Sequence, residues 1–247
     1  MEKEIKQHYL FGMHSVTEAI LSGKTIEKVM IKKGLEGDQF RELMVLLEEK
    51  NITAQFVPIE RLDRIKRGAH QGVIAFISNI EYVDLETLVE KALAKNDAPI
   101  FIMLDGVSDV RNFGAIARTS ECAGVSGLIL PAKGGAAINA DAIKTSAGAL
   151  LRIDTCKTPN LRLPIFYLKE KGFQIVVASE KSSNFIYDVD FKKPTVIVMG
   201  SEGKGVSKSV LSLSDESVKI PMMGEIGSLN VSVATSVVLY EAVRQRR

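Results

Sequence analysis

The sequence predicts an α/β protein in which a small α/β domain precedes a larger domain with a mostly parallel sheet and helices on both faces. Apolar segments of strand length alternate along the chain with segments whose apolar residues recur at helical spacing. Residues 100–104 and 195–199 consist almost entirely of apolar and β-branched side chains, which is typical of parallel strands buried on both faces. Such alternation predicts a layered α/β fold.

The composition is that of an ordinary soluble chain. Its 247 residues, 46% apolar and 25% charged, suffice for two modest domains. No apolar run approaches the roughly 20 residues that span a bilayer, and the first six residues lack the apolar core of a signal peptide. We therefore expect a cytoplasmic protein without membrane contact. The net charge of +2 gives only weak support for an anionic partner.

Cysteine and histidine usage limits the possible chemistry. Cys122 and Cys156 form no C-x-x-C pair, so we expect two small buried side chains and neither a disulfide framework nor a zinc site. All three histidines lie in the first 70 residues. The second domain should therefore contain no histidine-ligated metal and no catalytic triad that depends on histidine.

The first domain is expected to span residues 1–80. The pattern predicts strands at 9–12, 28–31, 53–57 and 72–77 and helices at 15–21 and 38–50. Before the last strand, Arg61, Arg64 and Arg67 stand with Lys66 in a stretch that has one aspartate. These arginines suit contacts with RNA phosphates. A solvated helix face explains the same pattern equally well.

An acidic connecting segment is expected at residues 81–98, including a helix at 85–94 that packs on the second domain. The second domain should span residues 99–247. Its predicted strands lie at 100–104, 128–130, 150–153, 173–178, 195–199 and 218–221. Its predicted helices lie at about 112–124, 139–146, 161–171, 206–213 and 228–245.

Ligands of open parallel sheets bind beyond the carboxyl ends of the strands. The loops after Leu104, Ala178, Met199 and Ile220 should therefore form one side of a crevice. Asn112 and Ser228 stand where helix N-caps are expected. The residues that this arrangement brings together are Asn112, Arg118, Glu202, Ser228 and Asn230.

The glycine-rich loop Gly200-Ser-Glu-Gly-Lys-Gly205 fits neither of two common nucleotide motifs. Its Gly-Lys pair is followed by glycine and not by Ser or Thr, which excludes a Walker A loop. It also lacks the spacing and the place on a first strand that a dinucleotide fingerprint requires. By itself the loop indicates only a turn whose backbone can approach a ligand closely.

Three motifs together resemble those of the SpoU (TrmH) class of SPOUT methyltransferases. The first is Asp105-Gly-Val107 with Asn112-Phe-Gly-Ala-Ile-Ala-Arg118, and the second is Val198-Met-Gly-Ser-Glu-Gly-Lys-Gly205. The third is Ile220-Pro-Met222 with Ser228-Leu-Asn-Val-Ser-Val-Ala234 and Glu241-Ala-Val-Arg-Gln-Arg246. Residues 8–80 resemble the ribosomal-protein-like substrate-binding domain of the same family through Gly12-Met-His-Ser-Val16 and His70-Gln-Gly-Val73.

The resemblance implies S-adenosylmethionine-dependent 2′-O-methylation of an RNA ribose, a C-terminal trefoil knot that forms the cofactor pocket, and a homodimer. It assigns catalysis to Asn112, Arg118, Glu202, Ser228 and Asn230. It assigns cofactor binding to Ala178, Ser179, Gly200, Gly203, Ile220, Met222, Leu229 and Asn230. Because arginine stays charged in proteins, we expect Arg118 to polarise the 2′-hydroxyl rather than to act as a base.

The first domain points to enzymes of the RlmB type, which implies a guanosine of 23S rRNA, free or in a ribosomal precursor particle, as the substrate. Two alternatives stay open. One is the same chemistry on tRNA or on an rRNA site of antibiotic resistance. The other is a non-catalytic RNA-binding assembly factor that keeps the fold without the reaction.

Overall fold

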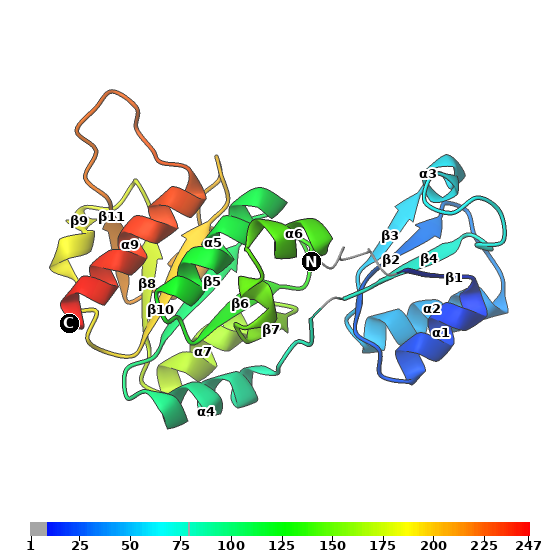
Figure 1. Ribbon diagram of the computed structural model, residues 1–247, viewed down its shortest axis with the longest axis horizontal. Helices are drawn as coiled ribbons and strands as arrows, with labels where there is room; N and C mark the ends of the chain where they lie inside the picture. Colours follow the sequence, from blue (N-terminus) through cyan, green and yellow to red (C-terminus); the bar gives the residue numbers. More distant parts are fainter. Residues whose placement is uncertain (1–8, 79) are drawn as a thin grey trace. The chain divides into compact units, whose positions relative to one another are not determined.

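The computed structural model describes residues 9–78 and 80–247, so the first eight residues of the expected 1–80 domain lie outside the description. The chain divides into two compact units: the first ends at Glu81 and also includes Ile138–Ala140, and the second comprises Tyr82–Ala137 and Asp141–Arg247. Each unit has its own sheet (Figure 1). The segment expected to connect the domains therefore belongs to the second unit from Tyr82 onward.

The first unit contains a four-stranded mixed sheet in the order β1-β4-β2-β3. Its strands are β1 (Tyr9–Phe11), β2 (Ile26–Lys32), β3 (Ala54–Val57) and β4 (Val73–Ile77). β4 is antiparallel to both β1 and β2, and β2 is parallel to β3. The helices are α1 (Met13–Leu21), α2 (Asp38–Glu49) and the short α3 (Ile59–Asp63).

The two faces of this sheet are covered unequally. Val29, Ile31 and Val73 pack with α1 and α2 in the larger apolar cluster. The neighbouring residues Met30 and Ile74 point to the opposite face, because side chains alternate along a strand. There the covering element is α3, through Leu62 and the following Ile65, and Tyr9 and Phe11 stay partly exposed.

The second unit contains seven parallel strands in the order β7-β6-β5-β10-β8-β11-β9. Its strands are β5 (Ile100–Asp105), β6 (Gly127–Pro131), β7 (Thr155–Thr158), β8 (Gln174–Ala178), β9 (Asn184–Phe185), β10 (Thr195–Gly200) and β11 (Glu216–Lys219). Its helices are α4 (Leu85–Lys95), α5 (Val110–Cys122), α6 (Ala140–Thr145), α7 (Arg162–Glu170), α8 (Lys208–Leu211) and α9 (Val231–Gln245), with 3-10 turns η1 (Ala149–Leu151) and η2 (Ile186–Asp188).

Helices cover both faces of this sheet, which confirms the predicted fold class. Phe101 and Met103 pack with residues of α4 and α7 on one face. The alternate residues Ile102 and Leu104 are also buried, and α5 and α9 lie on that opposite face (Figure 1). The fully apolar sequence of β5 therefore reflects burial on both sides. The trefoil knot stays a prediction.

The strand predicted at residues 150–153 is wrong. Leu150 lies in the 3-10 turn η1, which follows a left-handed Gly148, and the strand of this region is β7, which begins at Thr155. Leu150 and Ile153 are buried, in the turn and just after it. Buried apolar residues in a short turn give the same sequence pattern as a buried strand. The strand predicted at 218–221 lies two residues earlier, at Glu216–Lys219.

Two predicted helix caps and one predicted burial are also wrong. Asp109, not Asn112, caps α5, and its Oδ1 accepts hydrogen bonds from the backbone N–H groups of Arg111 and Asn112, both at 2.9 Å. Asn230, not Ser228, caps α9. Cys156 is buried, as expected, and burial raises the pKa of its thiol to about 11, but Cys122 is exposed.

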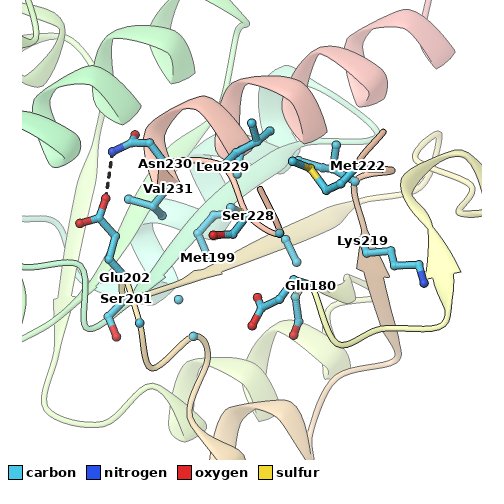
Figure 2. A pocket seen from close by; sticks show the side chains of 18 of the residues that line it. Glu180, Met199, Ser201, Glu202, Lys219, Met222, Ser228, Leu229, Asn230 and Val231 are labelled. Atoms are coloured by element: carbon cyan, nitrogen blue, oxygen red, sulfur yellow. Dashed lines mark hydrogen bonds between the residues drawn. The ribbon is translucent and has the colours of Figure 1, made fainter. Parts of the chain in front are cut away.

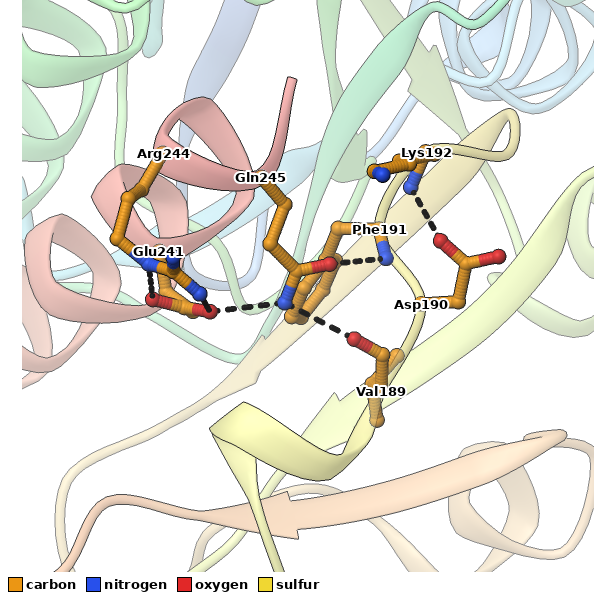
Figure 3. A network of polar contacts seen from close by, with 7 residues as sticks. All are labelled: Val189, Asp190, Phe191, Lys192, Glu241, Arg244 and Gln245. Atoms are coloured by element: carbon orange, nitrogen blue, oxygen red, sulfur yellow. Dashed lines mark hydrogen bonds and ion pairs between the residues drawn. The ribbon is translucent and has the colours of Figure 1, made fainter. Parts of the chain in front are cut away.

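The end of α9 is tied to the segment before β10 by a polar network (Figure 3). The largely buried carboxylate of Glu241 accepts hydrogen bonds from Arg244 and Gln245. Gln245 also donates to the Val189 carbonyl at 3.0 Å and accepts from the Phe191 N–H at 2.9 Å. The hydrogen bond from Arg244 holds the pKa of Glu241 below its usual value, against the opposing effect of burial. The network fixes the position of the last helix.

Within the described residues, no helix has both the length and the apolar character that crossing a membrane requires. The same residues include no cluster of three or more His, Cys, Asp or Glu side chains arranged to hold a metal ion.

Candidate functional site

A pocket of about 660 Å³ lies at the carboxyl ends of β8, β10 and β11 (Figure 2). Because the strands are parallel, these ends meet at one edge of the sheet, where ligands of such sheets bind. Three segments form its walls: the end of β8 and the residues after it, the glycine-rich loop after β10, and the residues from the end of β11 to the first turn of α9.

The glycine-rich loop is a tight turn that needs glycine at its base. Ser201 and Gly205 pair through two backbone hydrogen bonds of 2.8 and 3.2 Å, so the chain reverses within five residues. A Cβ at Gly200 would lie 2.1 Å from the carbonyl carbon of Gly205, which leaves no space for a side chain. Gly203 has a left-handed φ of 81°. The glycines of the loop thus bring backbone close to one wall of the pocket, where the side chains of Ser201 and Glu202 also lie.

The start of α9 supplies the opposite wall. The side-chain oxygen of Asn230 accepts hydrogen bonds from the N–H group of Ser232 at 2.9 Å and from its hydroxyl at 2.6 Å. This leaves the amide nitrogen of Asn230 to face the glycine-rich loop, as Figure 2 shows. The cap and the site therefore use opposite ends of one side-chain amide.

Asn112, Glu202 and Asn230 form a hydrogen-bonded cluster beside the pocket, although they come from three separate segments. Asn230 Nδ2 lies 2.9 Å from Glu202 Oε1 and 3.0 Å from Asn112 Oδ1. Asn112 Nδ2 donates to the same Glu202 oxygen at 2.9 Å. The cluster links the first turn of α5, the glycine-rich loop and the cap of α9. Asp109 and Ser232, which were not predicted, position two members of the cluster. An Asp three residues before Asn112 is a recognisable cap signal.

Of the five predicted catalytic residues, Glu202, Ser228 and Asn230 line the pocket, and Asn112 contacts two of them. Arg118 does not line it. Six residues along a helix correspond to about 9 Å of rise and about 240° of rotation, so Arg118 leaves α5 on another side than Asn112. Its side chain is exposed, and no described residue forms a hydrogen bond or ion pair with it.

All eight residues that the resemblance assigns to cofactor binding line this one pocket: Ala178, Ser179, Gly200, Gly203, Ile220, Met222, Leu229 and Asn230. Two carboxylates, Glu180 and Glu202, and one ammonium, Lys219, are its charged groups. Glu180 was not predicted. Nothing in its immediate sequence distinguishes it from a surface glutamate.

The three predicted RNA-binding arginines lie in or just after α3, all with exposed side chains. The buried ring of His70 fixes the turn that follows. Its Nδ1 accepts from the Gly72 N–H at 2.9 Å, so its Nε2 carries the proton and lies 3.0 Å from Asp63 Oδ1. The carboxylate of Asp63 is thereby engaged, and the described residues offer Arg61, Arg64 and Arg67 no ion-pair partner.

Two family models match the sequence. The model for RNA 2′-O ribose methyltransferase substrate binding matches residues 9–83, and the model for the SpoU rRNA methylase family matches residues 99–240. A TrmH-family relative from Staphylococcus haemolyticus is 36% identical over 237 residues, which are 96% of this chain and 95% of the relative. The TrmH-family relative YacO of Bacillus subtilis is 33% identical over 242 residues, which are 98% of this chain and 97% of the relative.

Solved structures agree with this placement. The Streptomyces viridochromogenes SpoU methyltransferase AviRb, solved in complex with its cofactor AdoMet, has a TM-score of 0.61 at 23% identity and covers 97% of this chain and 90% of its own, which supports the fold alone. A TrmH/SpoU tRNA-modifying enzyme of A. aeolicus is 36% identical with a TM-score of 0.56, covering 66% of this chain and 84% of its own. The predicted SpoU/TrmH resemblance is confirmed, and the chain belongs to the SpoU rRNA methylase family.

Proposed function

We propose that this protein transfers a methyl group from S-adenosylmethionine to the 2′-hydroxyl of a ribose in RNA. The acceptor we propose is a guanosine of 23S rRNA. One observation carries the proposal: the pocket that contains all eight expected cofactor residues adjoins the Asn112–Glu202–Asn230 cluster. A cofactor site and a polar cluster next to it are what transfer between two bound molecules requires.

The pocket suits S-adenosylmethionine in size and in charge. Its volume of about 660 Å³ lies within the roughly 300–1,000 Å³ typical of small-molecule sites. The carboxylates of Glu180 and Glu202 match the positive sulfonium and amino groups of that cofactor, and the glycine-rich loop offers backbone groups to its uncharged parts. When bound, S-adenosylmethionine supplies a methyl group that is activated by the positive charge on sulfur.

The chain's own residues position the acceptor. Asn112 and Glu202 hold each other and Asn230 in place, and Ser228 offers a hydroxyl within the pocket. Arg118 grips the phosphate next to the acceptor ribose and polarises the 2′-hydroxyl, whose proton leaves to phosphate or water as the oxygen accepts the methyl group. Positioning of this kind contributes on the order of 7 kcal/mol or more to lowering a barrier.

A homodimer accounts for the exposure of the site and of Arg118. Glu202 and Asn230 are exposed in the single chain, whereas charge stabilisation is strongest where water is excluded. The exposed side of α9 carries an apolar stripe with Val233 48% and Tyr240 50% exposed. A second copy seated on this stripe covers it and brings Arg118 toward a pocket at the subunit interface.

The preference for rRNA over tRNA rests on the first unit. Residues 9–83 match the substrate-binding model, whereas the tRNA-modifying enzyme of A. aeolicus matches 66% of this chain. That enzyme's 36% identity keeps a tRNA ribose as the second candidate. In that case the same methyl transfer would occur on tRNA in place of rRNA.

Two measurements test the proposal. Calorimetry should show S-adenosylmethionine binding, which a non-catalytic assembly factor does not require. Primer extension at low nucleotide concentration on 23S rRNA from a deletion strain should lose one pause that the wild-type strain shows. A lost methyl group in tRNA instead would favour the second candidate, and absence of both cofactor binding and any lost methyl group would contradict methyl transfer.

A further inference from the structure

We infer that the α3-side face of the first sheet is a binding platform for unpaired RNA bases, with Tyr9 and Phe11 as stacking rings and Lys28 and Lys66 as phosphate contacts. The inference rests on the proposed function and deepens it. It assigns the first unit a single-stranded substrate segment and names the residues that hold it.

Aromatic and cationic side chains form an ordered row on this face. Tyr9 pairs with Phe76 across β1 and β4, and Phe76 pairs with Lys28 across β4 and β2. The rings of Tyr9 and Phe76 lie 6.4 Å apart, and the Lys28 ammonium lies 5.1 Å from the Phe76 ring centroid. Two residues further along β1, on the same face, Phe11 pairs with Ile74, and the Lys66 ammonium lies 5.1 Å from the Phe11 ring.

The cover over this row is incomplete. The other face of the sheet is packed by the two longer helices α1 and α2, while the five-residue α3 covers this one. Tyr9 and Phe11 pack against the apolar cluster but stay partly exposed, and the Tyr9 hydroxyl donates to the Ile65 carbonyl at 3.4 Å. Lys66 approaches Phe11 on a flexible stem. A lysine over a ring in water contributes little and leaves easily, so a nucleobase can take its place while the ammonium moves to a phosphate.

The charge around the row matches a polyanion. Arg61 and Arg64 are exposed, and Arg61 lies close enough to Lys28 to act on its charge. Asp63 is already bonded to His70. Glu27, next to Lys28 in the sequence, and Glu60, next to Arg61, are the other neighbouring carboxylates. The pKa of Lys28 is lowered, first by burial and then by the positive charge of Arg61, with Glu27 opposing both. Two cations that disfavour each other's charge are relieved when a phosphate binds between them.

The partly exposed rings of Tyr9 and Phe11 favour unpaired over paired RNA. Bases in a duplex are stacked on one another and present only their edges, whereas unpaired bases offer a π-face to an aromatic side chain. The Lys28 ammonium lies over Phe76, the ring next to Tyr9, and the Lys66 ammonium lies over Phe11, so each stacking ring has a cation near it for the phosphate of a stacked base. A loop, bulge or single-stranded end of the substrate RNA therefore fits this platform, and a continuous duplex does not.

Fluorescence anisotropy with the full-length protein tests the platform, using a labelled 12-nucleotide oligouridylate and a duplex of the same length at several salt concentrations. Phe11→Leu and Tyr9→Leu keep apolar side chains and should each weaken single-strand binding about tenfold, in the range for loss of one stacked base, without changing the salt slope. Lys28→Gln and Lys66→Gln should each reduce that slope by about 0.7.

Phe56→Leu and Arg41→Gln are matched controls. Phe56 contacts Phe40 of α2 on the opposite face, and Arg41 lies on α2 paired with Asp38. Both variants should bind like the wild type, and thermal melting should verify that every variant folds. Wild-type preference for the duplex, or equal loss in the controls, overturns the platform. Calorimetry with S-adenosylmethionine separates the two proposals, since platform variants should bind the cofactor normally even where RNA binding is lost.

Discussion

The two units differ in how their candidate sites are built: one is a preformed pocket and the other is a set of exposed cations. The pocket of the second unit is built from backbone turns and from side chains that already bond to one another, such as Asn112, Glu202 and Asn230. The α3 region of the first unit presents Arg61, Arg64 and Arg67 without ion-pair partners among the described residues. A preformed neutral or acidic pocket depends on shape, whereas unpaired cations depend on ionic strength. The comparison predicts that cofactor binding and RNA binding respond to different perturbations.

The largest effect should come from Gly200→Ala, which tests whether the pocket depends on shape. The added Cβ would overlap Gly205 backbone at 2.1 Å, so the turn must open and the wall of the pocket must move. We expect cofactor binding to become undetectable by calorimetry and the melting temperature to fall. Gly224→Ala is the control, because a Cβ there meets nothing within 4 Å. Normal binding by Gly200→Ala would show that the turn does not form the wall.

Arg118→Ala should follow, with a fall in kcat of about 10²- to 10³-fold, the usual cost of removing one group that stabilises developing charge. Cofactor affinity should stay near wild type, because Arg118 lines no part of the pocket in its own chain. RNA affinity should fall modestly, because one proposed phosphate contact is lost. Arg162→Ala, an exposed arginine on α7, should leave kcat unchanged. Full turnover by Arg118→Ala would remove it from the reaction.

Two substitutions of Glu202 test whether the cluster needs its hydrogen-bond acceptor or its negative charge. Glu202→Ala removes the acceptor of two amide hydrogen bonds, and we expect a loss of about 10- to 100-fold in kcat/KM, which corresponds to roughly 1.4–3 kcal/mol for charge-assisted hydrogen bonds. Glu202→Gln keeps an acceptor oxygen and should retain activity within about fivefold if positioning dominates. An equal loss in both variants would indicate that the negative charge itself is needed.

The basic stretch should respond to salt. Replacing Arg61, Arg64 and Arg67 by glutamine should lower the slope of log Kd for RNA against log salt by about 2, because each phosphate contact contributes roughly 0.7–0.9. Calorimetry should find cofactor affinity unchanged in the same protein. An unchanged slope would favour the solvated helix face as the correct interpretation of this stretch.

The smallest effect is a labelling difference between the two thiols. Iodoacetamide at pH 8 should modify exposed Cys122 and spare Cys156, whose pKa of about 11 leaves it protonated. Mass spectrometry should find one adduct. Cys122 lies on α5 with Arg118, so slower labelling at high protein concentration would support coverage of that side by a second copy. A rate independent of concentration would argue against such coverage.

Sequence patterns predicted the sheet of the second unit because its strands are apolar on both faces, as in β5 and β10. They did not predict β9, whose two residues, Asn184 and Phe185, are both exposed and too few to form a pattern. The run at 150–153 was misassigned because buried apolar residues occur in 3-10 turns as well as in strands. Such short runs are ambiguous without tertiary contacts.

The candidate site was predictable as a set of residues but not as a geometry. Strand ends in a parallel sheet place Glu202 and Asn230 at one edge, which the sequence indicates. Which side-chain atoms bond depends on backbone angles that no spacing rule supplies. The cap of α5 at Asp109, by contrast, follows a pattern that the sequence contains. The sequence predicts Arg118 in the crevice, whereas helix rotation directs it elsewhere in the single chain.

Asn230 both starts the last helix and closes the cluster at the pocket. A molecule whose final helix has docked one residue out of register loses the amide that Glu202 and Asn112 require. The start of the last helix and the assembly of the cluster therefore depend on the same side chain, so the cluster is complete only when this helix is correctly docked.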